Sequence, residues 1–498
     1  MSPVGLATAP IGRWEAARGC LLSGRHADRK SLGPGPVQDQ ARSIVTTLVS
    51  GTTRFVGRDR DLAVVRRLMG STRLVTLTGP GGVGKSRLAA RVLDQWPDDV
   101  WQVDLSEVVD VSGMVHEMTH RLGIRPSSGA GDRPTRSLID FFADRDGLLV
   151  LDNCDRALAA CRELVPELLR ACPALRIIVT SRQSVGTAHE AVVGLDPLTV
   201  PEPGIDVTVE SAGRSESVQL FVDRAASVAP GFTLTDDNVA AVARLCVALD
   251  GLALAVELAA ARIRELSPEA MLERLGDRYR LLESRFRDVP ERLSSLEASM
   301  TWSHDLCSPA EQLLWARLSV FVDGFEVEDV EEVCSGDGLD RNDVARLVEC
   351  LVAKSIVTVE ADADPRRWRL LDSIREYGAT RLAEHDDPQR WAARHRDWCG
   401  SSAARLGGHP ARPEGPGESP GRSPGLTPRE HEVAVLVGAG LTNQQIASRL
   451  GISVRTVHGH MEKILRRLGF SSRAQVAAWI ARRPDVGPAE VSPPASAS

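Results

Sequence analysis

The fold class predicted for this chain is an α/β domain with a doubly wound parallel sheet, followed by all-α helical and winged-helix domains and a C-terminal all-α helix-turn-helix domain. Three observations predict it. Short apolar runs alternate with helical stretches between residues 74 and 182, which is the pattern of a parallel sheet covered by helices. A glycine-rich stretch lies between the first apolar run and the helix that follows it. From about residue 215 onward, apolar residues recur at helical spacing.

Length and composition indicate several globular domains. A chain of 498 residues is too long for one core, so two to four domains are expected. No apolar run is long enough to span a membrane, and the N-terminus lacks the apolar core of a secretory signal. The nine cysteines include no C-x-x-C pair, which argues against a zinc site or a disulfide framework. A cytoplasmic protein with no membrane partner is therefore predicted.

Charge is distributed unevenly along the chain. Residues 426–484 hold nine Lys or Arg and three acidic residues, a net charge of +6, which leaves −13 for the rest of a chain whose total is −7. A basic module on an acidic body indicates a polyanionic partner for that module alone.

The glycine-rich stretch at 79–86 fits G-x-x-x-x-G-K-[ST], the phosphate-binding loop of nucleoside triphosphatases. An apolar strand at 74–78 precedes it and a helix at 87–93 follows it, so the loop opens onto a helix N-terminus that favours phosphate. This complete context disfavours a chance glycine-rich turn. Lys85 is predicted to reach the β- and γ-phosphates, and the Ser86 hydroxyl to bind Mg²⁺. The predicted phosphate contacts are Gly79, Gly81, Gly82, Val83, Gly84, Lys85, Ser86 and Arg87.

Further strands are predicted at 100–105, 148–153 and 176–182, alternating with helices. Ligands of such sheets bind at the carboxyl ends of the strands. Asp152 falls at such an end and is predicted to be the Walker B acid that holds Mg²⁺. The alternative is a strand-terminal aspartate that caps a loop.

Two more side chains are candidates for catalysis beside Lys85 and Asp152. Asp155 could polarise the attacking water, although Asn153 stands where many ATPases of this class carry a second acid. Arg182 ends its strand and is predicted to sense the γ-phosphate as a bidentate donor. Its alternative is a surface salt bridge.

The chain is divided by composition and periodicity. Ser308 and Pro309 mark a helix start. Two short β runs at 356–359 and 368–371 indicate the hairpin of a winged helix, a module that often packs internally or binds protein. The predicted segments are a disordered extension at 1–50, the P-loop domain at 51–205, a helical subdomain at 206–294, a winged-helix-like domain at 295–399, a Gly/Pro/Ser linker at 400–425, a helix-turn-helix at 426–484 and a disordered tail at 485–498.

The basic module has the pattern of a helix-turn-helix. Thr427 and Glu430 form a capping box around Pro428, a second helix covers 443–450, and a glycine turn leads into a third helix at 454–468. The outward residues of the last helix are mostly polar and basic, as a major-groove reader requires; a solvated helix face is the alternative. The predicted DNA contacts are Thr427, Asn443, Ser453, Arg455, Thr456, His458, His460, Lys463, Arg466 and Arg467.

Several stretches taken together resemble a known family. The body resembles the STAND class of signalling ATPases, of the NB-ARC-like kind found in bacterial regulators, and the tail looks like a LuxR-type helix-turn-helix. The stretches that carry the resemblance are Phe55-Val56-Gly57-Arg58, the phosphate loop, Leu149-Val150-Leu151-Asp152-Asn153-Cys154, Thr180-Ser181-Arg182, Gly251-Leu252-Ala253-Leu254, Leu370-Leu371-Asp372-Ser373-Ile374-Arg375-Glu376-Tyr377 and Leu426-Thr427-Pro428-Arg429-Glu430.

This resemblance implies a switch that binds ATP or ADP with Mg²⁺, with slow ATP hydrolysis as the reset. ADP would hold a closed form, and ATP with an effector signal would open it, promote homo-oligomerisation and let the tail bind promoter DNA. Val56, Gly57 and Arg58 would border the adenine. Ala253 stands where the family usually has proline, and only about residues 385–425 separate the winged helix from the tail, where relatives usually carry a long helical-repeat sensor.

Two other classes also combine a P-loop with DNA-binding helices. A replication-initiator-like ATPase that remodels DNA is one alternative, and strand-melting activity would support it. A P-loop kinase fused to a DNA-binding tail is the other, and it requires phosphate transfer to a small molecule. The leading hypothesis remains an ATP-dependent transcriptional regulator.

Overall fold

A computed structural model of the chain gives the fold. It describes residues 53–124, 134–201, 207–275, 278–283, 290–322, 324–360, 366–406, 426–438, 441, 443–452, 456–457, 459–461, 463–464, 476 and 480. The segments expected to be disordered, 1–50 and 485–498, lie outside these residues. Within the described ranges, no helix has the length and apolar character needed to cross a membrane.

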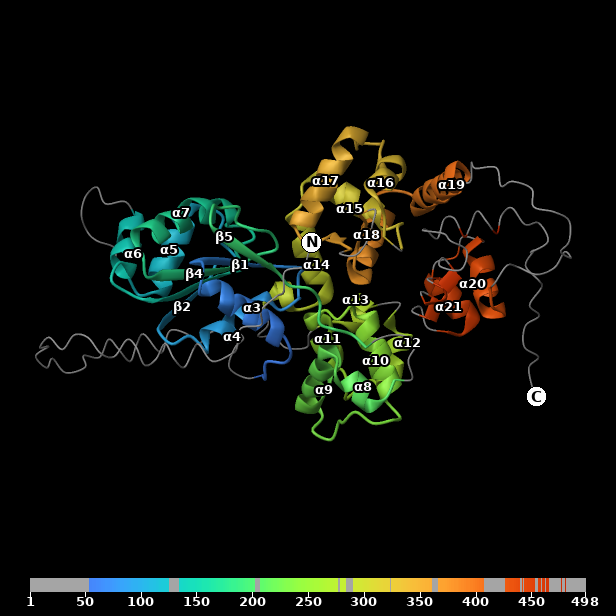
Figure 1. Ribbon diagram of the computed structural model, residues 1–498, viewed down its shortest axis with the longest axis horizontal. Coiled ribbons are helices and arrows are strands. Elements are labelled where there is room, and N and C mark those ends of the chain that lie inside the picture. The colour runs from blue at the N-terminus through green and yellow to red at the C-terminus, as the bar shows by residue number, and fades with distance from the viewer. Residues whose placement is uncertain are drawn as a thin grey trace, which may run out of the picture. The chain divides into compact units, whose positions relative to one another are not determined.

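A parallel sheet forms the centre of the first domain (Figure 1). Its strands, as far as the chain is described, lie in the order β2-β3-β4-β1-β5. They are β1 (Leu74–Thr78), β2 (Asp99–Asp104), β3 (Gly147–Asp152), β4 (Leu175–Thr180) and β5 (Glu190–Gly194). All four pairings are parallel. The predicted doubly wound α/β sheet is confirmed.

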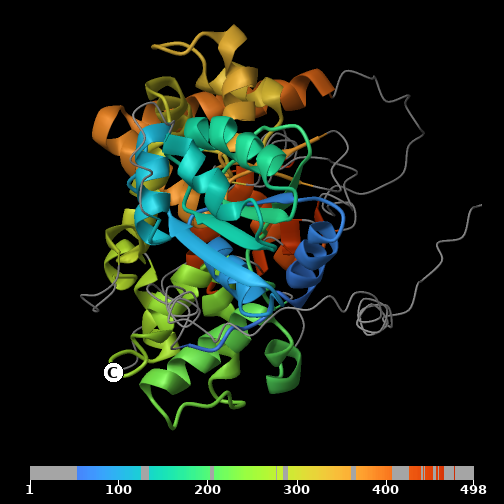
Figure 2. The same ribbon diagram turned by 90° about the vertical axis from the view of Figure 1, so that its left-hand side faces the viewer.

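Helices cover both faces of this sheet (Figure 2). Successive side chains of β3 point to opposite faces: Leu148 and Val150 pack in one apolar cluster, whereas Leu149 and Leu151 pack in another. Burial on both sides explains why this strand is apolar throughout. The helices of the domain are α3 (Asp59–Met69), α4 (Lys85–Leu93), α5 (Val111–Arg121), α6 (Pro134–Phe142) and α7 (Leu158–Ala171).

Two elements of this domain were not predicted. β5 pairs with β1 and exposes about half of Val192, as an edge strand does; its short, partly polar sequence gives no clear alternation. In α6, the side chain of Phe142 packs edge-on against Trp101 of β2, with ring centroids 5.1 Å apart.

An all-α region follows the sheet, as predicted. Its helices are α8 (Val209–Gly213), α9 (Glu216–Val228), α10 (Val239–Ala248), α11 (Ala253–Ala260), α12 (Pro268–Glu273) and α13 (Arg278–Leu281). Helix α11 ends at Ala260, beyond which the backbone continues as turns.

The winged-helix-like region contains the predicted helix start and hairpin. Ser308 and Glu311 form a capping box with Pro309 in the first turn, and Thr358 pairs antiparallel with Arg369. The last helix, α19, continues to Leu406, into the first residues of the expected linker. The elements are η2 (Glu291–Leu293), α14 (Leu296–Asp305), α15 (Pro309–Leu318), α16 (Val327–Cys334), α17 (Arg341–Ala353), β6 (Thr358–Val359), β7 (Trp368–Arg369), α18 (Asp372–His385) and α19 (Pro388–Leu406).

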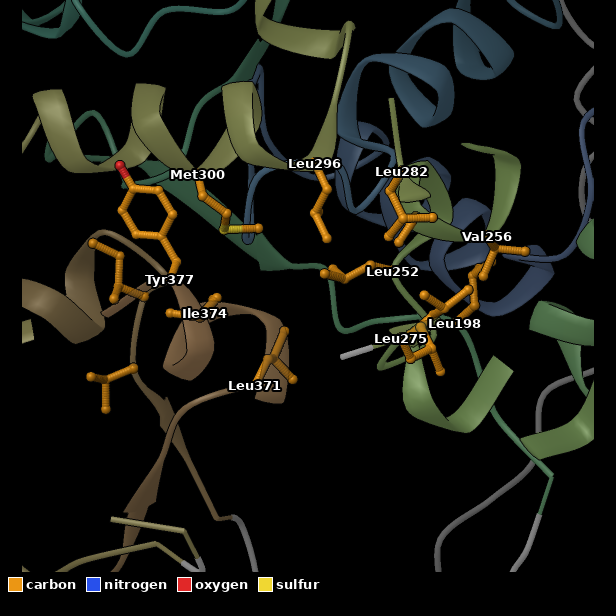
Figure 3. Close-up of a cluster of buried hydrophobic side chains, with 14 of the residues drawn as sticks. Leu198, Leu252, Val256, Leu275, Leu282, Leu296, Met300, Leu371, Ile374 and Tyr377 are labelled. Carbon is orange, nitrogen blue, oxygen red and sulfur yellow. The ribbon is translucent and has the colours of Figure 1, made fainter. Parts of the chain in front are cut away.

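One apolar core joins the helical and winged-helix-like regions. Its buried residues come from both regions and lie between Leu198 and Tyr377 in the sequence. Figure 3 shows part of this core, including Leu198, Leu252, Val256, Leu275, Leu282, Leu296, Met300, Leu371, Ile374 and Tyr377. The two regions therefore share the apolar burial that stabilises them.

The tail has its own core. α20 (Pro428–Gly438) starts with the predicted capping box, since the backbone N–H of Thr427 donates to Glu430 Oε2 at 2.8 Å. α21 (Asn443–Leu450) is followed by Gly451, whose φ of 63° suits the left-handed position after a helix. The buried residues are Val433, Ala434, Val437, Ile446, Ala447, Val457, Met461, Ile464, Val476 and Ile480.

Candidate nucleotide site and DNA-binding module

The phosphate loop joins β1 to α4, as predicted. Its backbone needs glycine, because φ is 143° at Gly79, 77° at Gly82 and 108° at Gly84, a range that L side chains rarely adopt. Gly84 is the N-cap of α4, which begins at Lys85. The loop therefore presents backbone N–H groups and a helix N-terminus, the combination that binds phosphate.

Lys85 is folded back onto the loop. Its Nζ donates to Gly79 O at 2.8 Å and to Pro80 O at 3.0 Å. Burial lowers the pKa of Lys85 to about 8, against the opposing effect of the Asp155 carboxylate. The ammonium is thus placed beside the loop that would hold the phosphates. A bound anion there would stabilise the charged form of Lys85.

Ser86 and Asp152 meet where the metal was predicted. Ser86 Oγ donates to Asp152 Oδ1 at 2.7 Å, and Thr180 Oγ1 donates to the same oxygen. Burial raises the pKa of Asp152. Two oxygens this close can serve as neighbouring ligands of Mg²⁺, which takes octahedral oxygen ligands at roughly 2.0–2.1 Å. The pair therefore fits the ion, although Asp152 is also held by protein hydroxyls.

Arg182 and Asp155 lie together at the next strand end. Asp155 Oδ1 accepts the backbone N–H of Arg182 at 2.7 Å and the Ser181 hydroxyl at 3.1 Å, and its Oδ2 lies 3.8 Å from Arg182 Nε. The guanidinium is buried, and its Nη1 finds no acceptor among the described residues. A buried donor without an acceptor is costly, and a phosphate oxygen would satisfy it. The Asp155 carboxylate thus holds both the backbone and the side chain of Arg182 in place.

Later parts of the chain close over the loop. The backbone N–H of Leu254 donates to Gly82 O at 3.0 Å. A Cβ at Gly81 would lie 2.6 Å from the Ser299 hydroxyl oxygen, and Arg182 Nη2 donates to Ser299 O at 3.3 Å. The stretch with Ala253 in place of proline thus still contacts the loop through its next residue.

The residues predicted to border the adenine are close to the loop as well. Arg58 has a φ of 66°, is buried, and donates from Nη2 to Val83 O at 2.8 Å. Its backbone N–H donates to Glu216 Oε1 at 2.7 Å. Val56 and Gly57 line a groove of about 970 Å³ together with residues of α3, α4, α8 and α9. Arg58 therefore supports the loop, while Val56 and Gly57 line the groove, Gly57 in close approach to the Glu216 side chain.

Arg87 was predicted as a phosphate contact, but its side chain is engaged elsewhere. It forms an ion pair with Glu257 and donates to the Thr53 hydroxyl. Arg224 Nε donates to the same Glu257 carboxylate at 2.8 Å. This network connects α4 with α9 and α11. The side chain of Arg87 therefore links the P-loop domain to the helical region.

Some contacts at the site were not predicted from the sequence. Gln102 Nε2 lies 3.4 Å from Asp152 Oδ2, and Thr180 donates to the other oxygen. Both residues stand on predicted strands near their carboxyl ends, a position that could have marked them. Ser299 lies on a distant helix, and no local pattern marks it.

The predicted DNA contacts are only partly described. Thr456 and Lys463 are exposed, whereas Val457, Met461 and Ile464 are buried, so this segment presents a polar face beside its apolar one. Asn443 is completely buried, in contrast to the exposed Thr456 and Lys463. His460 is half-buried. Ser453, Arg455, His458, Arg466 and Arg467 lie outside the described residues.

Comparison with protein families identifies two regions. Residues 424–480 match the family described as bacterial regulatory proteins, luxR family, and residues 67–187 match an AAA domain. The predicted combination of a P-loop ATPase domain with a C-terminal LuxR-type helix-turn-helix is confirmed. The first match implies DNA binding, and the second implies nucleotide binding.

Two proteins of Mycobacterium tuberculosis (strain ATCC 25618 / H37Rv) are similar over most of this chain. It is 40% identical over 348 residues to "Putative HTH-type transcriptional regulator Rv0890c", an alignment that covers 69% of this chain and 37% of that protein. It is 37% identical over 350 residues to "Uncharacterized protein Rv0894", covering 69% of this chain and 85% of that protein. The chain therefore matches little more than a third of the length of Rv0890c.

Among solved structures, the Walker-type ATPase PABY2304 of Pyrococcus abyssi is similar with a TM-score of 0.46 and 13% sequence identity. This match covers 67% of this chain and 99% of that one.

Proposed function

Because the chain belongs to the family of the mycobacterial protein Rv0894, we propose that it is an ATP-dependent transcriptional regulator of the STAND class. In this proposal, bound nucleotide controls DNA binding or assembly through the LuxR-type tail. The relative Rv0890c is named as an HTH-type transcriptional regulator, and this name supports transcription as the process that the switch controls.

One observation carries the proposal: the phosphate loop is contacted by segments that follow the sheet. Gly82 accepts a hydrogen bond from Leu254, and Gly81 and Arg182 contact Ser299 of α14. A phosphate bound at the loop and at the unsatisfied Arg182 Nη1 would lie beside these contacts and so could act on them. Binding can shift a conformational equilibrium only through such differential contacts.

Each site residue has a role in this scheme. Lys85 and the loop N–H groups would hold the β- and γ-phosphates, and Arg182 would contact the γ-phosphate. Ser86 and Asp152 would hold Mg²⁺, which neutralises phosphate charge when bound. Asp155 accepts hydrogen bonds from Arg182 and Ser181, and these bonds compete with activation of a water molecule by its carboxylate. Slow hydrolysis, suited to a reset, is the expected consequence.

The proposal is tested on the full chain with a library of randomised DNA duplexes. We expect selected sequences to be retained differently in the presence of Mg²⁺-ATP and Mg²⁺-ADP. Lys85→Ala should lose nucleotide binding by calorimetry together with this difference, while truncation before residue 426 should lose DNA retention but keep nucleotide binding.

Two results would count against the proposal. DNA retention that is identical with ATP, with ADP and without nucleotide would remove the switch. Nucleotide binding by Lys85→Ala at wild-type affinity would remove the site assignment. Strand separation of a blunt duplex in the presence of ATP would instead favour a DNA-remodelling enzyme.

A further inference from the structure

A second carboxylate lies beside the metal-side aspartate. Asp104 ends β2 and is paired in register with Asp152, which ends β3. Its Oδ1 accepts the Asn153 side-chain amide at 3.1 Å and the Ser106 backbone N–H at 3.0 Å. Its Oδ2 accepts Arg292 Nη2 at 3.3 Å. An arginine from a remote part of the chain therefore lies at the carboxyl edge of the sheet.

Arg292 belongs to the short helix η2, which directly precedes α14. Only 17% of its side chain is exposed. Its charge also acts on the rest of the site. Burial raises the pKa of Asp152, and Arg292 opposes that rise; burial lowers the pKa of Arg182, and Arg292 adds to that fall. Through its contact with Asp104, Arg292 lies beside the metal-side aspartate of the candidate nucleotide site.

The paired charges of this site nearly cancel. Asp155 is paired with Arg182, and Asp104 is paired with Arg292. A nucleoside triphosphate brings one more negative charge than a diphosphate, and this charge lies at the γ-phosphate. Among the described residues, Arg292 is held by one half-buried carboxylate, that of Asp104. Its guanidinium can exchange this carboxylate for phosphate oxygens, which match the same planar fork of donors.

We propose that Arg292 determines specificity for the nucleoside triphosphate over the diphosphate. Asp104 and the γ-phosphate of a bound triphosphate compete for the Arg292 guanidinium. Because η2 leads into α14, whose Ser299 contacts Gly81, this exchange moves the segment that covers the phosphate loop. The inference rests on the proposed function, since it requires nucleotide at this site.

The test compares the affinities of the full chain for Mg²⁺-ATPγS and Mg²⁺-ADP by calorimetry. Arg292→Ala is expected to weaken ATPγS binding at least about tenfold and ADP binding much less, so the ratio of the two affinities falls. Arg292→Lys keeps the positive charge but not the planar fork of donors. Its ratio of ATPγS to ADP affinity should lie between those of the wild type and Arg292→Ala. Arg346→Ala is the matched control, because Arg346 forms an exposed ion pair with Asp343 on α17, and it should leave both affinities unchanged.

Asp104→Asn gives an independent readout. Removing the carboxylate that competes for Arg292 should strengthen ATPγS binding, roughly two- to fivefold, and this gain should vanish in the double variant with Arg292→Ala. Circular dichroism melting of each variant verifies that the fold is retained, and the lysine variant serves if the alanine variant unfolds.

Three outcomes overturn the inference. An unchanged ratio of ATPγS to ADP affinity in both Arg292 variants shows that the residue serves only the fold. Weaker binding of both nucleotides to Asp104→Asn assigns the carboxylate to the metal instead. Wild-type protein that binds neither nucleotide removes the proposed function together with this inference, whereas the first two outcomes leave the proposed function standing.

Discussion

The ammonium group of Lys85 makes nucleotide binding depend on pH. Burial lowers its pKa to about 8, so the group loses its charge as the pH rises through that value. A bound phosphate favours the protonated form, and binding must therefore take up a proton above pH 8. We expect the affinity for Mg²⁺-ADP to be steady near pH 7 and to fall by up to about tenfold per pH unit above 8. Calorimetry at several pH values in two buffers measures both effects.

Lys85→Arg is the control for this prediction. A guanidinium stays charged throughout this range, with a pKa above roughly 12, so the affinity of this variant should not vary between pH 7 and 9.5. A variant that loses affinity in parallel with the wild type would show that another group is responsible.

At the scale of residues, the site residues that could be predicted are those that a local motif or a strand end marks. The glycines, Lys85 and Ser86 follow one another in a single motif, and Asp152 and Arg182 stand at strand ends, so their meeting follows from the parallel sheet. Ser299 and Arg292 reach the site only because helices far along the chain fold back over it. No local spacing encodes such an approach, and sequence alone could not supply it.

At the scale of elements, the start of α18 shows how distant segments are joined. This helix has no side-chain cap of its own at Leu371. Instead, the carboxylate of Asp250 accepts the backbone N–H of Asp372 at 3.1 Å, the backbone N–H of Ser373 at 2.8 Å and the Ser373 hydroxyl at 2.7 Å. A residue between α10 and α11 thus satisfies the N–H groups that a helix start leaves unpaired.

Three substitutions of Asp250 distinguish the contribution of its capping hydrogen bonds to stability from that of its backbone strain. Its φ is 57°, a conformation that glycine and asparagine tolerate better than alanine. Asp250→Gly should lower the free energy of unfolding by about 1–2 kcal/mol through loss of the cap, and Asp250→Ala by roughly 1 kcal/mol more through strain. Asp250→Asn keeps an acceptor and should cost least. Urea titration gives these values, and equal losses for alanine and glycine would contradict the strain argument.

Elements with strong internal patterns were predictable, and those that depend on their neighbours were not. The capped helix after Ser308 and the alternating strands and helices of the sheet follow from spacing and capping. β5 is a strand because β1 offers it an open edge. Helix α11 ends at Ala260, where the apolar run gives way to a segment that contains Arg262, Arg264 and Glu265.

At the scale of the whole molecule, acidic and basic parts have been separated into different modules. The body carries most of the negative charge, and the tail carries a net charge of +6. DNA binding through such a tail is dominated by contacts with phosphates, which release counterions. Affinity should therefore fall steeply with salt for any duplex sequence, whereas the nucleotide site, whose charges are largely paired and half-buried, should respond weakly to salt.

Lys463 offers a test of this separation, since it is exposed in the segment predicted to read DNA. If it contacts a phosphate, Lys463→Ala should weaken binding to all duplexes by a similar factor and reduce the slope of log affinity against log salt by about 1. Arg346→Ala, on the body, removes the same charge and should leave that slope unchanged. Fluorescence anisotropy from 50 to 300 mM salt, roughly the range in which counterion release dominates, measures both slopes. An equal change in the two variants would mean that overall charge governs DNA affinity, because only a local contact distinguishes a charge on the tail from one on the body.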